Sequence, residues 1–401
     1  MAHIKTQGIT AKELLSFLPI ELLEQTAVQT QVDKNVKKLF GKDMFLLLLM
    51  AVLDSERVSL RVMEDLYNHH KFQLLAAIEK DSTTRFTSLS DRLMHIKAEF
   101  FEELFKATYE NLSKQYSIRQ MQKHSIIRFD STTISASAKL LTLGMVNGMP
   151  NAKSKEHDFK QVKITMGFDG LFTHSAKIFT DQKYLAEDLT LGETITEYSE
   201  SKDNIVVFDR GLKKRTVFAR FSEQGKLFVT RINPTKSYQV INTNDDIQSL
   251  KSDALQFISD EWVYLFHQKR NKLKVPFRLI QAKRKQDGQK LFFITNIKNM
   301  DAITIADIYK SRWDIEVFFR FLKQELNLKH FTSYSINGIK VMLYVLLIAA
   351  MLIMLYKKYN NIDGYKRAKI RFMQAIETEV TRMIVEICGG NPNATPYLNS
   401  T

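Results

Sequence analysis

Cysteine is almost absent from this sequence. Its 401 residues contain a single cysteine, Cys388. This excludes an internal disulfide framework and any metal site built from several cysteines, and a reducing cytosolic setting is expected. The N-terminal residues also lack the apolar stretch of a signal peptide.

Long hydrophobic runs are also scarce. The longest covers residues 341–356, which are 16 in number and are followed by Lys357 and Lys358. A membrane-spanning helix needs about 20 apolar residues, so a buried core helix is the better interpretation. We expect no membrane partner, and a membrane-associated helical protein stays open as an alternative.

Acidic residues are outnumbered by basic ones. The chain has 58 lysines and arginines against 44 aspartates and glutamates, a net charge of +14 and a pI near 9.5. Between residues 204 and 298 the count is 19 basic against 8 acidic residues. Solubility alone can explain a basic chain, but a local excess favours a nucleic-acid partner, because phosphate neutralisation is a local electrostatic effect.

Hydrophobic periodicity predicts an α/β fold with a mixed sheet and an N-terminal helical domain. Strands are expected at residues 125–130, 162–169, 171–179, 204–209 and 226–232, with helices at 185–198 and 212–224. The predicted domains are a helical DNA-end-binding domain (1–122), a core (123–235 and 300–360), a β-rich insertion (236–299), and a C-terminal helix and tail (361–401).

Two aspartates, Asp130 and Asp209, each follow an apolar strand-like run, IIRF and IVVF. A carboxylate at the end of a strand is well placed to face a cleft, although each could also be a turn former or helix cap. With a third carboxylate they would suit Mg²⁺, which binds through a few carboxylates and keeps several waters. Two such ions support phosphoryl transfer.

The third carboxylate is expected in the segment IYKSRWDIEVFFRFLKQELNLKHF, residues 308–331. If this segment is one helix advancing about 100° per residue, Tyr309, Arg312, Glu316 and Lys323 share a stripe about 60° wide. Apolar residues, Trp313 among them, flank the stripe on both sides. A local ion pair would explain Arg312 and Glu316. It does not explain the other two, which would suit contacts to DNA phosphates.

The spacing of these four residues resembles the YREK signature of bacterial insertion-sequence transposases of the DDE superfamily, which have a ribonuclease H-like catalytic core. Asp130 in FDSTTIS and Asp209 in FDRGLKKR are similar to the first and second catalytic aspartates of that family. The resemblance implies that Glu316 is the third carboxylate and that Tyr309, Arg312 and Lys323 contact DNA near the transposon end. A β-rich insertion and a long apolar helix after the signature are also typical of this branch.

The resemblance implies a bacterial, cytoplasmic, nucleoid-associated enzyme that cuts transposon ends and joins the 3′-hydroxyl to target DNA. It implies two Mg²⁺ or Mn²⁺ ions held by Asp130, Asp209 and Glu316, and a homodimer on double-stranded DNA with terminal inverted repeats. Cleavage in this branch often passes through a hairpin. Trp262 is a candidate for stacking on a base and Arg210 for meeting a phosphate, although strand packing and an ion pair explain them as well.

Two alternatives stay open beside the membrane-associated protein. One is a ribonuclease H-like nuclease that cuts but does not join DNA, and the other is a catalytically inactive DNA-binding repressor of transposition. His157, His174 and His267 have no spacing that fits a compact metal-ligand set, and structural roles are expected for them.

Overall fold

The computed structural model describes residues 8–54, 57–79, 82–116, 124–137, 144–146, 159–198, 203–235, 237–244, 247, 250–267, 271–333, 335–394 and 398. The chain divides into two compact units. The first comprises Met1–Ser117, Ala136–Leu143 and Phe319–Thr401, and the second comprises Ile118–Ser135 and Gly144–Phe318.

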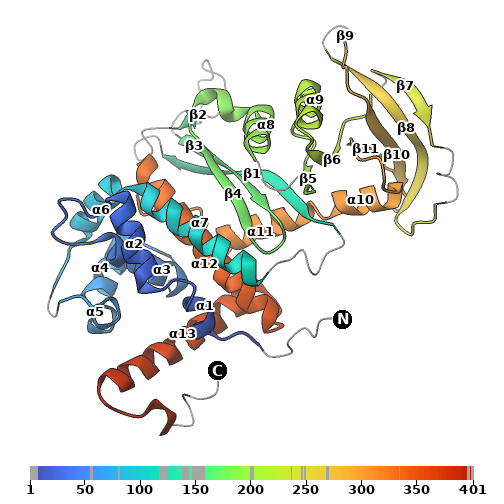
Figure 1. Ribbon diagram of the computed structural model, residues 1–401. Helices are drawn as coiled ribbons and strands as arrows, with labels where there is room; N and C mark the ends of the chain where they lie inside the picture. Colours follow the sequence, from blue (N-terminus) through green and yellow to red (C-terminus); the bar gives the residue numbers. More distant parts are fainter. Residues whose placement is uncertain are drawn as a thin grey trace. The chain divides into compact units, whose positions relative to one another are not determined.

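The first unit is helical (Figure 1). Its helices are α1 (Ala11–Leu15), α2 (Ile20–Thr30), α3 (Gly41–Asp54), α4 (Leu60–Asn68), α5 (His70–Ala76), α6 (Phe86–His95), α7 (Ala98–Gln115), α12 (Ile336–Tyr359) and α13 (Tyr365–Ile387), with a short 3-10 turn η5 (Pro392–Ala394). Polar side chains cap several of them. Ser335, for example, accepts a hydrogen bond from the Gly338 N–H at the start of α12.

Helix α12 is the centre of this unit and packs against α3, α6, α7 and α13. By length and composition it is apolar enough to cross a membrane, but 94% of its most apolar stretch is buried inside the structure. It therefore matches the predicted buried core helix at residues 341–356.

The second unit contains one sheet, with 11 strands in the part of the chain that the structure describes. The strands are β1 (Ile126–Ser137), β2 (Met145–Val146), β3 (Phe159–Phe168), β4 (Thr173–Phe179), β5 (Ile205–Phe208), β6 (Leu227–Arg231), β7 (Tyr238–Thr243), β8 (Leu255–His267), β9 (Asn271–Lys272), β10 (Phe277–Arg284) and β11 (Lys290–Thr295). Their order is β2-β3-β1-β5-β6-β11-β10-β8-β7, with β4 beside β3 and β9 beside β8.

The sheet is mixed, as predicted. β1 pairs with β5 and β5 with β6 in parallel, whereas β3 pairs with β4 and β6 with β11 in antiparallel fashion. The parallel connections carry helices, α8 (Glu187–Glu197) before β5 and α9 (Arg215–Glu223) between β5 and β6. The strands predicted from the insertion, β7 to β11, extend this same sheet.

Helices cover both faces of the central strands (Figure 1). Ile127, Phe129 and Phe208 face α8 and α9, in a core that includes Leu191 and Phe218. Val207 and Val229 face the other way and pack against α10 (Ala302–Lys310). The alternation of side chains along each strand therefore sends every second residue of β1 and β5 towards α10.

The structure corrects where the first predicted strand ends. Asp130 does not end its strand, because β1 continues to Ser137. The residues that follow keep a strand period, with Thr132 and Ile134 buried and their neighbours more exposed. Asp209, in contrast, directly follows β5 as predicted.

The segment at residues 308–331 is not one helix. It forms α10 and α11 (Trp313–Gln324), which are interrupted at Ser311 and Arg312. Around the interruption the hydrogen bonds span three residues, from the Asp314 N–H to the Ser311 carbonyl at 3.0 Å and from the Ile315 N–H to the Arg312 carbonyl at 3.3 Å. Trp313, expected to pack on the apolar side, is 53% exposed because it begins the new helix at this bend.

Candidate active site

Asp130 and Asp209 are brought together by the register of two neighbouring strands. β1 and β5 run parallel with Phe129 opposite Phe208, so each aspartate follows one member of that pair. Both phenylalanines belong to the core beneath α8 and α9, so Asp130 points to the opposite face of the sheet. Asp209 lies just beyond the end of β5, close enough for its charge to raise the pKa of Asp130. The sequence prediction that these two aspartates meet is consistent with this geometry.

Asp130 lies in a buried environment with two other negatively charged side chains nearby. Burial, together with the charges of Asp209 and Glu187, raises the pKa of Asp130 to about 7, although a 2.7 Å bond from the Ser131 N–H and the charge of Arg312 act in the opposite direction. A buried carboxyl group beside two others favours its neutral form when no cation is near enough to compensate. A divalent cation would supply that compensation.

Glu187 is a further acidic residue close to Asp130 and Asp209. It begins α8, and burial together with Asp209 raises the pKa of its carboxyl group. Gly211 shows how closely Glu187 and Asp209 approach, because a Cβ on that glycine would lie 1.9 Å from the Glu187 Oε2 and 2.8 Å from the Asp209 Oδ1. A methyl group at this position would require at least one of the two carboxylates to move.

Glu316 is held by a different partner. Its Oε1 lies 2.6 Å from the Arg312 Nη2, and Arg312 is close enough to Asp130 for each charge to influence the pKa of the other group. Among the described residues, no three His, Cys, Asp or Glu side chains are grouped as closely as a metal site requires. The structure thus brings Asp130 and Asp209 together and connects Glu316 to them through Arg312.

Tyr309 lies between two arginines. The guanidinium groups of Arg231 and Arg312 lie 5.7 and 5.9 Å from the centre of its ring. Burial, and the charges of Arg210, Arg284 and Arg312, lower the pKa of Arg231. The Nε atoms of Arg231 and Arg312 are buried and have no hydrogen-bond partner among the described residues. Such unsatisfied cationic donors suit an anionic ligand.

The other predicted residues lie on separate elements. Lys323 is half-buried in the last turn of α11, and Arg210 is exposed directly after Asp209. Trp262 is half-buried on β8, opposite Arg278 of β10 and Asn242 of β7. The contacts of Lys323, Arg210 and Trp262 with DNA stay predictions.

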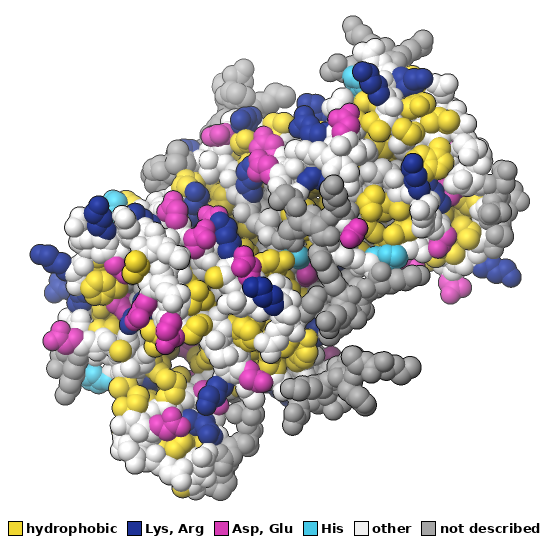
Figure 2. Space-filling view, in the orientation of Figure 1, with side chains coloured by type: hydrophobic (Ala, Val, Ile, Leu, Met, Phe, Trp, Pro, Cys, Tyr) yellow, Lys and Arg dark blue, Asp and Glu magenta, His cyan; other side chains and the backbone are white. Residues whose placement is uncertain are grey.

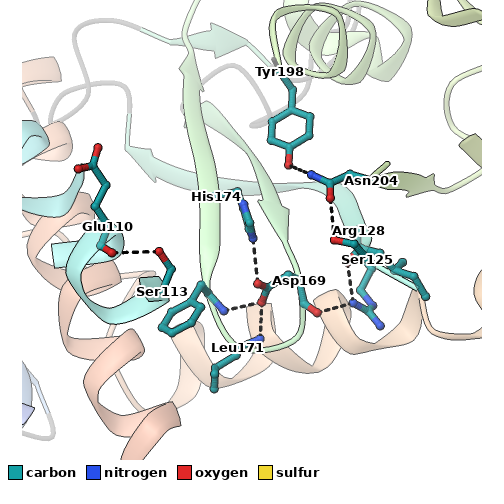
Figure 3. Close-up of polar contacts among 11 residues, drawn as sticks. Glu110, Ser113, Ser125, Arg128, Asp169, Leu171, His174, Tyr198 and Asn204 are labelled. Carbon is teal, nitrogen blue, oxygen red and sulfur yellow. Dashed lines mark hydrogen bonds and ion pairs between the residues drawn. The ribbon is translucent and has the colours of Figure 1, made fainter. Parts of the chain in front are cut away.

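The structure describes two of the three histidines, and these lie on different strands. His174 pairs with Asp169, with 2.9 Å between the Nε2 and Oδ2 atoms (Figure 3). His267 ends β8 opposite Asn271, and His157 lies outside the described residues, as do residues 138–143 and 147–158 of the polar connection after β1.

Sequence reasoning missed Glu187, Arg231 and Arg128. Glu187 looks like an ordinary acidic residue in the first turn of a helix. Arg231 ends β6, which lies parallel to β5, so the strand order would have placed it beside Asp209. Arg128 is a charged residue inside the apolar run SIIRFD, two residues before Asp130, and that position alone indicated that it needs buried partners.

Comparison with known proteins identifies the family. Residues 121–352 match the family model described as "Transposase DDE domain". The chain therefore belongs to the DDE transposases, the class of polynucleotidyl transferase predicted from the sequence. The α/β fold predicted for such a chain, a ribonuclease H-like mixed sheet with flanking helices, is confirmed.

Three relatives have insertion-element or transposase names. The chain is 30% identical over 175 residues to "Putative transposase y4zB" of Sinorhizobium fredii, covering 44% of this chain and 48% of that protein. It is 26% identical to "Putative transposase for insertion sequence element IS4SA" of Synechocystis, covering 70% and 74%. It is 27% identical to "Probable transposase for insertion sequence element IS5377" of Geobacillus stearothermophilus, covering 58% of each.

One solved structure also resembles this chain at a distance. It is the piggyBac transposase synaptic complex with hairpin DNA, with 9% identity and a TM-score of 0.44 over 96% of this chain and 83% of that one. The alignment with the first of the three relatives spans about half of that protein's length.

Proposed function

We propose that this chain is the transposase of an insertion sequence and that it cuts the ends of its element and joins the 3′-hydroxyl to target DNA. The observation that carries the proposal is the closeness of Asp130, on β1, to Asp209, directly after the parallel neighbour β5, with the Arg312–Glu316 ion pair near Asp130. The spacing of Tyr309, Arg312, Glu316 and Lys323 supports the insertion-sequence branch with the YREK signature.

Asp130, Asp209 and Glu316 are the residues that would hold Mg²⁺ or Mn²⁺. Two such ions activate an attacking oxygen and stabilise the leaving one in an in-line displacement. In the structure described here Glu316 is bound to Arg312, so we propose that it leaves Arg312 when it joins the two aspartates. Arg312 is then available, with Arg231 and Tyr309, to bind a phosphate next to the reacting bond.

The partners follow from the same proposal. They are double-stranded DNA with terminal inverted repeats, target DNA, and a second copy of the chain in the DNA complex, in a bacterial cytoplasm at the nucleoid. The helical residues 1–122 would bind the DNA ends, residues 123–235 and 300–360 would form the catalytic core, and residues 236–299 would be its insertion. A hairpin step and a base-stacking role for Trp262 belong to the branch that the signature indicates.

The excess of basic residues is compatible with DNA as the partner. Figure 2 shows lysine and arginine side chains on many parts of one face, with acidic and hydrophobic side chains between them. The local concentration of positive charge at the site is Arg231 and Arg312 beside Tyr309, with Arg210 and Arg284 close enough to Arg231 to lower its pKa.

The direct test incubates the purified protein with paired terminal repeats, a target plasmid and Mg²⁺. Joined products support the transposase. Cleavage without joining would favour a nuclease, and binding of the ends without cleavage would favour a repressor. The terminal repeats are obtained from the DNA that flanks the gene.

Replacing Gly211 by alanine should reduce cleavage about a hundredfold, because the new methyl group forces Asp209 or Glu187 out of place. The comparison is Gly192→Ala in α8, where the nearest atom would lie at an ordinary 3.5 Å. That variant should cleave like the wild type. Equal cleavage by the two variants would show that the close approach at Gly211 has no role in the reaction.

A further inference from the structure

Arg128 is a cation buried in the middle of the sheet. It lies on β1, two residues before Asp130, and its side chain is 2% exposed. Residues two apart on a strand face the same side, so Arg128 and Asp130 both point away from the core beneath α8 and α9. A guanidinium group in such a place is tolerated only when its N–H groups find acceptors.

The acceptors of Arg128 come from three separate parts of the chain. Its Nε donates to the Ser311 carbonyl at 2.8 Å, and its Nη2 lies 3.0 Å from the Asp314 Oδ2. Its Nη1 donates to the carbonyls of Asp169 at 2.7 Å and of Ile126 at 3.2 Å. Figure 3 shows the contact with Asp169, which follows β3. Arg128 thus connects β1, the end of β3 and the junction between α10 and α11.

The contact with Ser311 coincides with the break in the helix. In a continuous α-helix the Ser311 carbonyl would accept from the Ile315 N–H. Here it accepts from Arg128 and from the Asp314 N–H, while the Ile315 N–H turns to the Arg312 carbonyl. Arg312 directly follows Ser311, and Glu316 lies one turn further. The direction in which both side chains leave the backbone therefore depends on this junction.

We propose that Arg128 is a positioning residue of the active site, which ties the strand carrying Asp130 to the α10–α11 junction and thereby sets where Arg312 and Glu316 stand. The inference rests on the proposed function, since it assumes that the three carboxylates act together on one cation. It assigns no contact with DNA or metal to Arg128 itself. Its effect is transmitted through Ser311 and Asp314.

The test measures Mn²⁺ binding to the full chain by electron paramagnetic resonance, and in parallel the binding of DNA ends. Arg128→Lys keeps the positive charge but loses the planar guanidinium group, whose several N–H donors reach the separate acceptors. We expect it to weaken Mn²⁺ binding about tenfold or more, as losses in the outer shell of metal sites do. End binding should stay within about threefold of the wild type, because displacing Arg312 affects only one of several proposed contacts with DNA.

The matched control is a second buried arginine–aspartate pair in the same unit. Arg278 on β10 and Asp260 on β8 are 5% and 4% exposed, and Arg278 also donates to the Met300 carbonyl. Arg278→Lys should lower thermal stability as Arg128→Lys does, but leave Mn²⁺ affinity unchanged. Equal weakening by both variants, or wild-type affinity in Arg128→Lys, would overturn the proposal.

Asp314→Asn provides a second test that does not depend on the folding of a core variant, because Asp314 is 52% exposed. It removes the ion pair but leaves the carbonyl bonds of Arg128, so Mn²⁺ binding should weaken about threefold. An unchanged affinity in this variant contradicts the proposal. If the wild type binds Mn²⁺ but joins no DNA, the proposed function fails while the role of Arg128 is still decided. If the wild type binds no Mn²⁺, both fail.

Discussion

Replacing Glu316 by glutamine should lower the cleavage of DNA ends about a thousandfold or more while end binding stays near the wild-type level. The substitution keeps the size of the side chain and removes its charge, which the proposed site needs for holding cations. Metal ions contribute several kcal/mol of charge stabilisation in phosphoryl transfer, and each 1.4 kcal/mol corresponds to about a factor of ten in rate. Single-turnover cleavage of a labelled terminal repeat measures the loss.

Two further substitutions make this experiment decisive. Glu223→Gln, at an exposed position near the end of α9, is a control that should cleave normally. Glu187→Gln tests whether the acid next to Asp209 is the third carboxylate instead of Glu316. If Glu316→Gln cleaves within about tenfold of the wild type and Glu187→Gln does not, the assignment of Glu316 is wrong.

Replacing Asp130 by asparagine should stabilise the metal-free protein at pH 8 and do so much less at pH 5. In the folded chain the pKa of Asp130 is raised from 3.8 to about 7, chiefly by burial. The folded state therefore holds this proton between those values while the unfolded state has lost it. The stability that the proton contributes is lost as the pH rises through this window.

The expected size follows from the same shift. Each pH unit within the window corresponds to about 1.4 kcal/mol, so between pH 5 and pH 7 the wild type should lose about 2–3 kcal/mol that the asparagine variant keeps. Glu187 has a raised pKa as well, and its leading causes, burial and the charge of Asp209, are present in both proteins. Urea unfolding with a chelator present measures the difference, and Asp253→Asn at an exposed position is the control. If Asp130→Asn increased the free energy of unfolding equally at pH 5 and pH 8, this would falsify the assignment of the raised pKa to Asp130.

Much of the fold could be predicted because its signals are local. The strands around Asp130 and Asp209 contain runs such as IIRF and IVVF, whose β-branched and aromatic residues specify extended structure. The buried helix α12 follows from its apolar composition. The pairing of the two aspartates was predictable as well, because parallel neighbouring strands bring equivalent positions to one side of the sheet.

The features that escaped prediction depend on contacts distant in sequence. The period of residues 308–324 is that of a continuous helix, and nothing within the segment shows that Arg128, far upstream, takes the Ser311 carbonyl. The same is true of Glu187, whose approach to Asp209 passes over Gly211. Local periodicity cannot report which side chains from other elements compete for a backbone acceptor.

The pairing of β6 with β11 has a consequence for how this chain can be altered. β11 lies antiparallel beside β6 and places Phe293 opposite Arg231, so the insertion supplies the strand that completes the hydrogen bonds of β6. Cutting out residues 238–295 would leave β6 as an open edge, which is a template for aggregation. The insertion is therefore a continuation of the catalytic sheet, and a shortened enzyme would need a replacement strand at this edge.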